Sequence, residues 1–314
     1  MSHAHHVTEQ VPASKHRPAR AGFQAAVALL IGTLAGALGL LPWWITGAKL
    51  PLQNLWASPV MPEQMPLALL PLSQYEILAL IALLTTGGAL AGLAVRLWNP
   101  GHRTIATWCA IGGVLMVQVV ATVQSFSVLK DGLAGGKLTD FYYFGLLAGA
   151  ISSIIAGMVA LLLVAAKSRA TAALGVGLVV VPVTSWAVQW VIGVAGRSNM
   201  PLEVPTIAHW VPAVLVGCAL AWCGLKPAVR IIVWVLNLAF LWVIPAVFTA
   251  VQSVLATRAI AGDIPEMLSM GRSVLTAALG PDGGAWQTLL LAVGIGLAGA
   301  GIRAIAARKI SSQP

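Results

Sequence analysis

Uncharged polar side chains inside an apolar segment are the residues of this chain best suited to bind a ligand. Gln118, Thr122 and Ser125 recur at positions i, i+4 and i+7, a spacing that places them on one face of a helix, and Gln124 lies beside that face. Amides and hydroxyls donate and accept hydrogen bonds without carrying charge. Such groups suit a binding pocket or a substrate path better than acid–base catalysis, which needs titratable groups.

A matching set of side chains occurs further along the chain. The tripeptide Val-Gln-Ser at 123–125 recurs at 251–253, and Thr249 precedes its second copy. We predict that seven side chains line a substrate path in the outer half of a membrane: Gln118, Thr122, Gln124, Ser125, Thr249, Gln252 and Ser253. Thr184, Ser185 and Gln189 of the segment 172–194 add to this polar set. Hydrogen bonding between neighbouring helices is the simpler interpretation of the same residues.

The segments that carry these residues are long and apolar. About 20 mostly apolar residues span a bilayer, and eight runs come close to that length or exceed it: 22–41, 77–95, 105–128, 142–166, 172–194, 207–225, 231–257 and 285–302. Only 9% of the residues are charged, against about 25% in soluble domains. The sequence therefore predicts an all-α polytopic membrane protein with eight transmembrane helices.

Basic residues predict which way the chain is oriented. With the N-terminus in the cytoplasm, twelve of the 18 Lys and Arg residues but only one of the nine acidic residues lie inside. The inner cations are Lys15, Arg17, Arg20, Arg96, Arg103, Lys167, Arg169, Lys226, Arg230, Arg303, Arg308 and Lys309. This excess fits the positive-inside rule and predicts cytoplasmic termini and a multi-pass protein of the cytoplasmic membrane. The net charge of +9 belongs to short flanks that meet anionic lipid, so we expect lipid contacts and no nucleic-acid partner.

The order of several short matches indicates an internal repeat. Besides the Val-Gln-Ser pair, Trp44-Ile45-Thr46-Gly47 parallels the segment 190–193, and Ala165-Ala166-Lys167 parallels the segment 306–308. We predict two parallel four-helix repeats, at 22–169 and 170–309, between a basic tail at 1–21 and a short tail at 310–314. Chance similarity between hydrophobic segments is the alternative.

Small residues and prolines predict how these helices pack. Gly32 with Gly36, and Gly88 with Gly92, have the GxxxG spacing that lets helix backbones approach closely. We expect these contacts within one molecule rather than between copies. Pro182, Pro212 and Pro245 lie inside predicted spans, and each should bend its helix because proline lacks an amide donor.

Several chemistries lack the residues that they require. No acidic or basic residue lies near the middle of a predicted span, although Glu76 lies at an edge, and ion-coupled carriers often keep such groups there. Outer acids, and His209 with Glu203, form no catalytic spacing. We therefore predict no catalytic residue, no metal site and no cofactor, while an enzymatic role stays a minor alternative.

Two classes of function remain open. The first is a permease-like protein that handles a small or amphipathic molecule in the outer half of the membrane. The second is a non-catalytic subunit or scaffold of a membrane or envelope complex, with a protein partner on the outer face. Long outer segments at 48–76 and 258–284 and very short cytoplasmic loops favour this second class. The segment 258–284 predicts either a helix in the outer interface or a cap over the helix ends.

Overall fold

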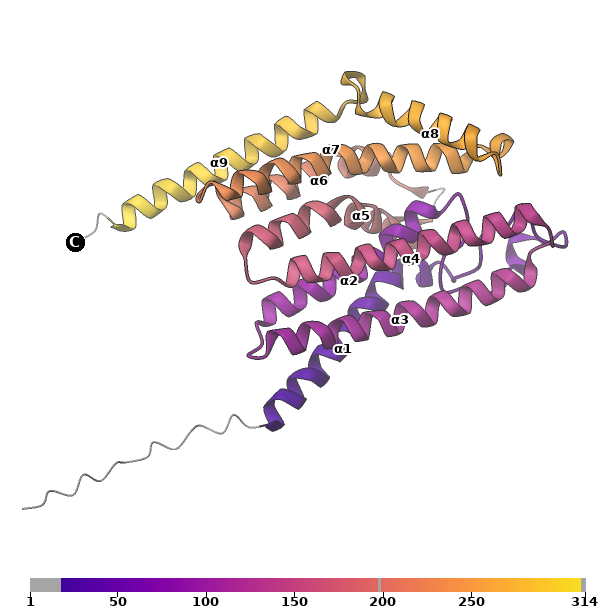
Figure 1. The fold of residues 1–314 in the computed structure, drawn as a ribbon, viewed down its shortest axis with the longest axis horizontal. Coiled ribbons are helices and arrows are strands. Elements are labelled where there is room, and N and C mark those ends of the chain that lie inside the picture. The colour runs from indigo at the N-terminus through magenta and orange to yellow at the C-terminus, as the bar shows by residue number, and fades with distance from the viewer. Residues whose placement is uncertain (1–17, 197–198, 312–314) are drawn as a thin grey trace, which may run out of the picture.

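The chain folds into a bundle of long helices (Figure 1). The computed structural model describes residues 18–196 and 199–311. Eight helices of this part are long and apolar enough to cross a membrane, with mean hydropathies from 1.7 to 2.4. They are α1 (Pro18–Ile45), α2 (Ile77–Trp98), α3 (Arg103–Gly132), α4 (Lys137–Ala165), α5 (Arg169–Ala195), α6 (Glu203–Cys223), α7 (Val229–Ala256) and α9 (Ala285–Ser311). The predicted all-α membrane class with eight spans is confirmed.

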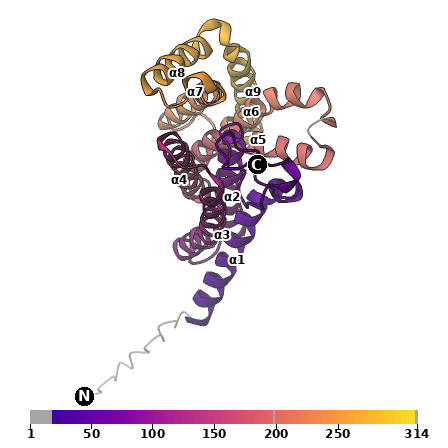
Figure 2. The ribbon, with the colours of Figure 1, turned by 90° about the vertical axis from the view of Figure 1, so that its right-hand side faces the viewer.

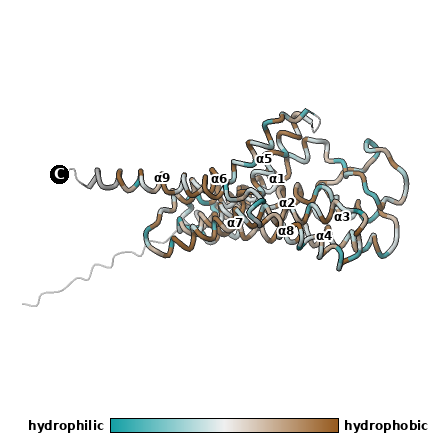
Figure 3. The backbone as a smooth tube through the Cα atoms, turned by 90° about the horizontal axis from the view of Figure 1, so that it is seen from above, coloured by the Kyte–Doolittle hydropathy of each residue, from teal (hydrophilic) through white to brown (hydrophobic). Residues whose placement is uncertain are grey.

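The start of α1 and the end of α9 lie at the same end of the bundle, which we call the inner end (Figure 1). The opposite end, the outer end, carries residues 46–76, which we call the first outer loop. Figure 3 shows hydrophobic residues along the helices and hydrophilic ones mostly at the ends and in loops. The orientation in the membrane stays a prediction. Part of the predicted tails and charge pattern lies outside the described residues, namely 1–17, Arg197 and 312–314. The side chains of three further basic residues also lie outside the described part of the structure: Arg20, Arg308 and Lys309.

Several helices extend beyond the apolar runs that predicted them, among them α3 and α4 at the outer end. The helix α3 continues to Gly132, and α4 already begins at Lys137, so the outer segment expected at 129–141 shrinks to 133–136. Polar residues there need water but do not end a helix, because the backbone hydrogen bonds continue past the bilayer. The chain turns at Gly136, whose φ of 138° favours glycine.

Close backbone contacts hold the first half of the bundle together. The Gly32 backbone lies directly against Ala110 of α3, and Gly88 lies against Gly157 of α4. A methyl group at either glycine would overlap the facing carbonyl oxygen. These contacts are within one chain. The Gly88 contact belongs to α2, which is the most buried of the spans, with 72% of its apolar window inside the protein.

The helix α5 joins the two halves of the bundle. It packs on α2 and α4 of the first half and on α6 and α7 of the second. Ala89, Ala160 and Val179 form a buried cluster where α2, α4 and α5 meet. Nearer the outer end, the Trp186 indole N–H donates to the Gly39 carbonyl oxygen of α1 at 2.9 Å. The halves therefore form one bundle.

The two halves have similar packing patterns. In each, the first helix packs on the second and third, and the second packs on the fourth. For α1–α4 these pairs are α1 with α2, α1 with α3 and α2 with α4; the corresponding second-half pairs are α5 with α6, α5 with α7 and α6 with α9. This agreement is what duplication would give, but the duplication itself stays a prediction.

The segment 258–284 contains a helix that packs along a span. The helix α8 (Ile264–Leu279) follows the short turn η3 (Arg258–Ile260) and runs back along the outer part of α7 (Figures 1 and 2). Pro265 lies in its first turn, where a missing amide donor costs little, and Asp263 accepts the Glu266 amide at 3.2 Å. A second short turn, η4 (Pro281–Gly283), leads into α9.

Candidate functional site

Gln118 and Thr122, two of the predicted path residues, make hydrogen bonds within the first half of the bundle. Gln118 is fully buried, and its Nε2 donates to the Leu84 carbonyl oxygen of α2 at 2.6 Å. Thr122 donates to the Gln118 carbonyl oxygen, one turn back in α3, at 2.7 Å. Ser125 is also fully buried. Gln118 therefore links α2 to α3, as the simpler interpretation of these residues expects.

Gln124 and Ser125 bind the first outer loop. The Gln124 amide donates to the Leu67 carbonyl oxygen and accepts the Leu69 N–H, both at 2.9 Å, while the Ser125 Oγ accepts the Leu70 N–H at 2.9 Å. A glutamine amide can pair with a backbone N–H and C=O in this way because it carries one acceptor and two donors. The pair thus fixes the loop on α3.

The second copy of the motif contacts another part of the same loop. Gln252 Nε2 donates to the Tyr75 carbonyl oxygen at 3.3 Å. Thr249 donates within α7 to the Pro245 carbonyl oxygen at 2.9 Å, and the Ser253 carbonyl oxygen accepts the Thr257 hydroxyl at 2.9 Å. The structure therefore brings Gln124 and Gln252 to the same loop, and neither lines the two cavities described below.

Indole groups add to this attachment of the loop. The Trp43 N–H donates to the Ala68 carbonyl oxygen at 2.8 Å, and the Trp44 N–H donates to that of Leu69 at 3.2 Å. Leu50, Leu70 and Leu72 are buried in the cluster beneath. The first outer loop is thus a packed cap over the outer end of the first half.

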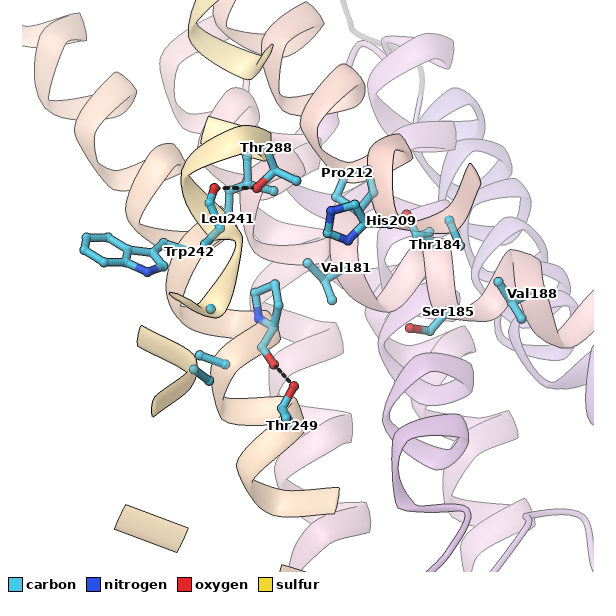
Figure 4. Close-up of a pocket in the computed structure, with 16 residues that line it drawn as sticks. Val181, Thr184, Ser185, Val188, His209, Pro212, Leu241, Trp242, Thr249 and Thr288 are labelled. Carbon is cyan, nitrogen blue, oxygen red and sulfur yellow. Dashed lines mark hydrogen bonds between the residues drawn. The ribbon is translucent and has the colours of Figure 1, made fainter. Parts of the chain in front are cut away.

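A polar-lined cavity lies in the second half, toward the outer end (Figure 4). Its volume is about 250 Å³, close to the lower end of the range of about 300–1,000 Å³ for small-molecule sites. The helices α5, α6, α7 and α9 supply its polar side chains: Thr184, Ser185, His209, Thr249 and Thr288. We call it the second-half cavity, and Thr249 is the predicted path residue that it contains.

Several hydrogen-bond acceptors line this cavity. Thr184, Thr249 and Thr288 already donate their hydroxyl protons to backbone carbonyls at 2.8 to 2.9 Å, so their oxygens can only accept further bonds. Pro212 and Pro245 line the same cavity. Because proline has no N–H, each leaves the carbonyl oxygen four residues earlier in its helix without a backbone donor. These oxygens belong to Ala208 and Leu241, which also line the cavity. The cavity therefore suits a molecule that presents N–H or O–H groups.

Sequence reasoning recognised parts of this cavity separately. The sequence places Thr184 and Ser185 in the polar set and predicts that Pro212 and Pro245 bend their helices, while His209 stands apart beside Glu203. It does not single out Thr288. A polar residue within one turn of an in-span proline is a signal that joins Thr184, Ser185, His209 and Thr249, because a proline exposes a carbonyl oxygen that needs a polar environment; this signal does not reach Thr288.

Comparison of the chain with protein-family models, with curated proteins and with solved structures finds no match. The fold itself defines the class: the chain is a multi-pass integral membrane protein, since eight of the described helices are long and apolar enough to span a bilayer.

Proposed function

We propose that this membrane protein is permease-like and binds a small molecule with several hydrogen-bond donors in the second-half cavity. The observation that carries the proposal is the convergence of acceptors from four helices on one space of about 250 Å³. In a bundle without mid-span charges, interrupted helices supply such binding groups in many transporters. Pro212 and Pro245 each remove one backbone hydrogen bond inside α6 and α7, which makes it easier for the outer parts of these helices to move relative to their inner parts.

The chemistry of the cavity narrows the ligand. His209 is exposed and is the one lining residue with a titratable side chain, so the site offers no carboxylate to bind a strong cation and no Arg or Lys to bind an anion. A neutral polyol, an amide or a small amine in its uncharged form fits these groups best. The space is too small for a whole lipid, so the amphipathic substrate considered from the sequence does not fit here.

A cavity-filling variant tests this proposal. Ser185→Leu should fill the space and remove one hydroxyl, while thermal stability without ligand should stay near that of the wild type. Purified protein would be screened for stabilisation by polyols, amides and small amines, and a compound present at 100 times its Kd should stabilise the protein by about 2.7 kcal/mol. We expect such a compound to stabilise the wild type and not Ser185→Leu, and to enter proteoliposomes only with the wild type.

The matched control is Ser152→Leu on α4, where the serine is exposed; it should behave like the wild type. A stabilising compound that acts equally on Ser185→Leu would refute the assignment to this cavity. A screen in which no member of the three classes stabilises the wild type would refute the ligand class.

The second candidate function, a non-catalytic subunit of a membrane or envelope complex, is favoured by the well-packed first outer loop. Gln124, Ser125, Trp43 and Trp44 fix that loop as a surface beyond the spans. Purification in mild detergent should then recover a stoichiometric protein partner, and replacement of exposed Met61, whose side chain is 66% exposed, with Glu should release it. Recovery of the protein alone would count against this candidate.

A further inference from the structure

A second cavity at the outer end lies between the two halves of the bundle. It has a volume of about 330 Å³ and is lined by the outer ends of α2, α4 and α7 together with Met267 of α8. The helix α5 packs on both α4 and α7, whereas α4 and α7 are not among the closely packed helix pairs of the described bundle. Figure 2, which looks onto the outer end, shows α4 beside α7 and α8. We call this space the lateral groove.

The lining of the lateral groove is mostly apolar. Its apolar side chains include Ile77, Leu138, Phe141, Leu146, Val254 and Leu255. Phe141 and Leu138 are 41% and 43% exposed, so the groove is accessible from the side. Gly145 also lines it, and no atom lies within 4 Å of the position where a side chain would start. An acyl chain would fit such a space, because it buries apolar surface at both partners.

Polar groups occur at one edge of the groove. Arg258, Asn54 and Gln74 line it there. The recorded partner of the Arg258 guanidinium in the described residues is Tyr75, through a hydrogen bond from Nε to the hydroxyl and through the ring, whose centroid lies 5.5 Å from Cζ. No Asp or Glu side chain is among the residues that line the groove, so the charge of Arg258 can pair with an anion there.

The positive charge of Arg258 affects the pKa of the Tyr75 hydroxyl. Burial by itself would raise the pKa of the Tyr75 hydroxyl, but hydrogen bonds with Arg258, Asn54 and Gln74, together with the charge of Arg258, outweigh it and lower this pKa below its ordinary value. Asp263 and Glu266 lie nearby in sequence, but Asp263 accepts the Glu266 amide at the start of α8, and neither lines the groove. The charged group that lines the groove is therefore a cation.

The depth of the groove agrees with a lipid in the outer leaflet. From Leu138 to Leu146 the wall follows α4 for about 12 Å, at about 1.5 Å per residue. Its first part lies before the apolar run 142–166, at the level of the headgroups, and its second part lies within that run. Half the hydrocarbon thickness of a bilayer is about 15 Å. Arg258 lies two residues beyond Ala256, the last residue of α7, and so lies at the level of the headgroups, while the apolar wall reaches into the hydrocarbon region.

We infer that the lateral groove is a specific binding site for an anionic phospholipid of the outer leaflet, with one acyl chain between α4 and α7 and the phosphate beside Arg258. This site is separate from the second-half cavity, and it does not depend on transport. A lipid bound there would fill the gap between the halves at the outer end.

Two pairs of variants test the site, with phosphatidylglycerol and phosphatidylcholine as the probes. Arg258→Gln should lower the preference for retained phosphatidylglycerol over phosphatidylcholine about fivefold, the effect expected for one basic residue at an anionic surface. Its control, Arg272→Gln on the exposed face of α8, should leave the preference unchanged. Native mass spectrometry of protein released from mixed nanodiscs measures the ratio.

The second pair tests the acyl chain. Gly145→Leu should abolish retention of both lipids, because its side chain occupies the groove. Gly294→Leu, at an exposed helical glycine of α9 with equally open surroundings, should retain them. An unchanged lipid ratio in Arg258→Gln, or unchanged retention in a folded Gly145→Leu, would overturn the site.

A measurement on the wild type keeps the inference testable if a variant does not fold. Phosphatidylglycerol with a photoactivatable acyl chain should cross-link mainly to peptides covering 138–146 and 254–267. Cross-links that are as frequent on 285–306, a segment exposed to lipid along its length, would show ordinary annular lipid and refute the inference.

Discussion

Replacement of Gly88 with leucine is expected to prevent the first half of the bundle from folding. The Gly88 backbone lies directly against the Gly157 carbonyl of α4, and any side chain at position 88 would overlap that carbonyl oxygen. Overpacking in a core costs about 1–3 kcal/mol when side chains can rearrange, and occasionally more. Here the obstacle is backbone, so α2 and α4 must move apart, and the loss should exceed this range.

The measurement is the yield of monodisperse protein in detergent, together with its thermal midpoint. Gly294→Leu is the control, because no atom lies within 4 Å of the position where its side chain begins; it should be produced like the wild type. A Gly88→Leu protein with a wild-type melting point would show that α2 and α4 do not pack as described. A folded protein that only changes its oligomeric state would instead place this glycine at an interface between copies.

The second large effect is expected from Gln124→Leu, which should release the first outer loop from α3. The substitution removes the hydrogen bonds to Leu67 and Leu69 while keeping a side chain of similar size. Two hydrogen bonds of about 1 kcal/mol each correspond to about 2 kcal/mol. Amide exchange of Leu69 should accelerate roughly 30-fold, since 1.4 kcal/mol is a factor of about ten.

Hydrogen–deuterium exchange of the segment 67–70 measures this release. Gln189→Leu is the matched control, because the Gln189 side chain forms no hydrogen bond within the described part of the chain. Amide exchange at 67–70 in this variant should equal that of the wild type. Unchanged exchange in Gln124→Leu would contradict the attachment. The double variant Gln124→Leu with Gln252→Leu separates attachment of the loop from a role in the substrate path. Lost uptake with an intact loop would assign these glutamines to the predicted substrate path.

Helix ends show where local sequence was sufficient and where it was not. The apolar run 77–95 predicted α2 (Ile77–Trp98) closely, because Glu76 and Asn99-Pro100 flank it. The apolar run 142–166 predicted the start of α4 less well, because the helix already begins at Lys137. Hydropathy detects the part of a helix that lies in lipid, whereas the helix continues into water as long as its backbone hydrogen bonds do.

The candidate sites depended more strongly on tertiary structure. The repeated Gln-Ser pair was visible in the sequence, but its partners at 67–70 and at Tyr75 come from a loop that is remote in the chain from both copies. Gly145 and Arg258 form one groove although more than 100 residues separate them in sequence. Neither residue has a distinctive neighbour that would have singled it out.

The sequence by itself determined the solvent and the number of crossings. Transfer of a segment into lipid depends on the summed hydropathy of that segment, which is a local quantity. Only the tertiary structure decided which helices meet, which loop covers the outer end and where space is left between helices. Apolar faces gain nothing from turning away from apolar lipid, so packing follows from the fit of small residues and a few hydrogen bonds between distant segments.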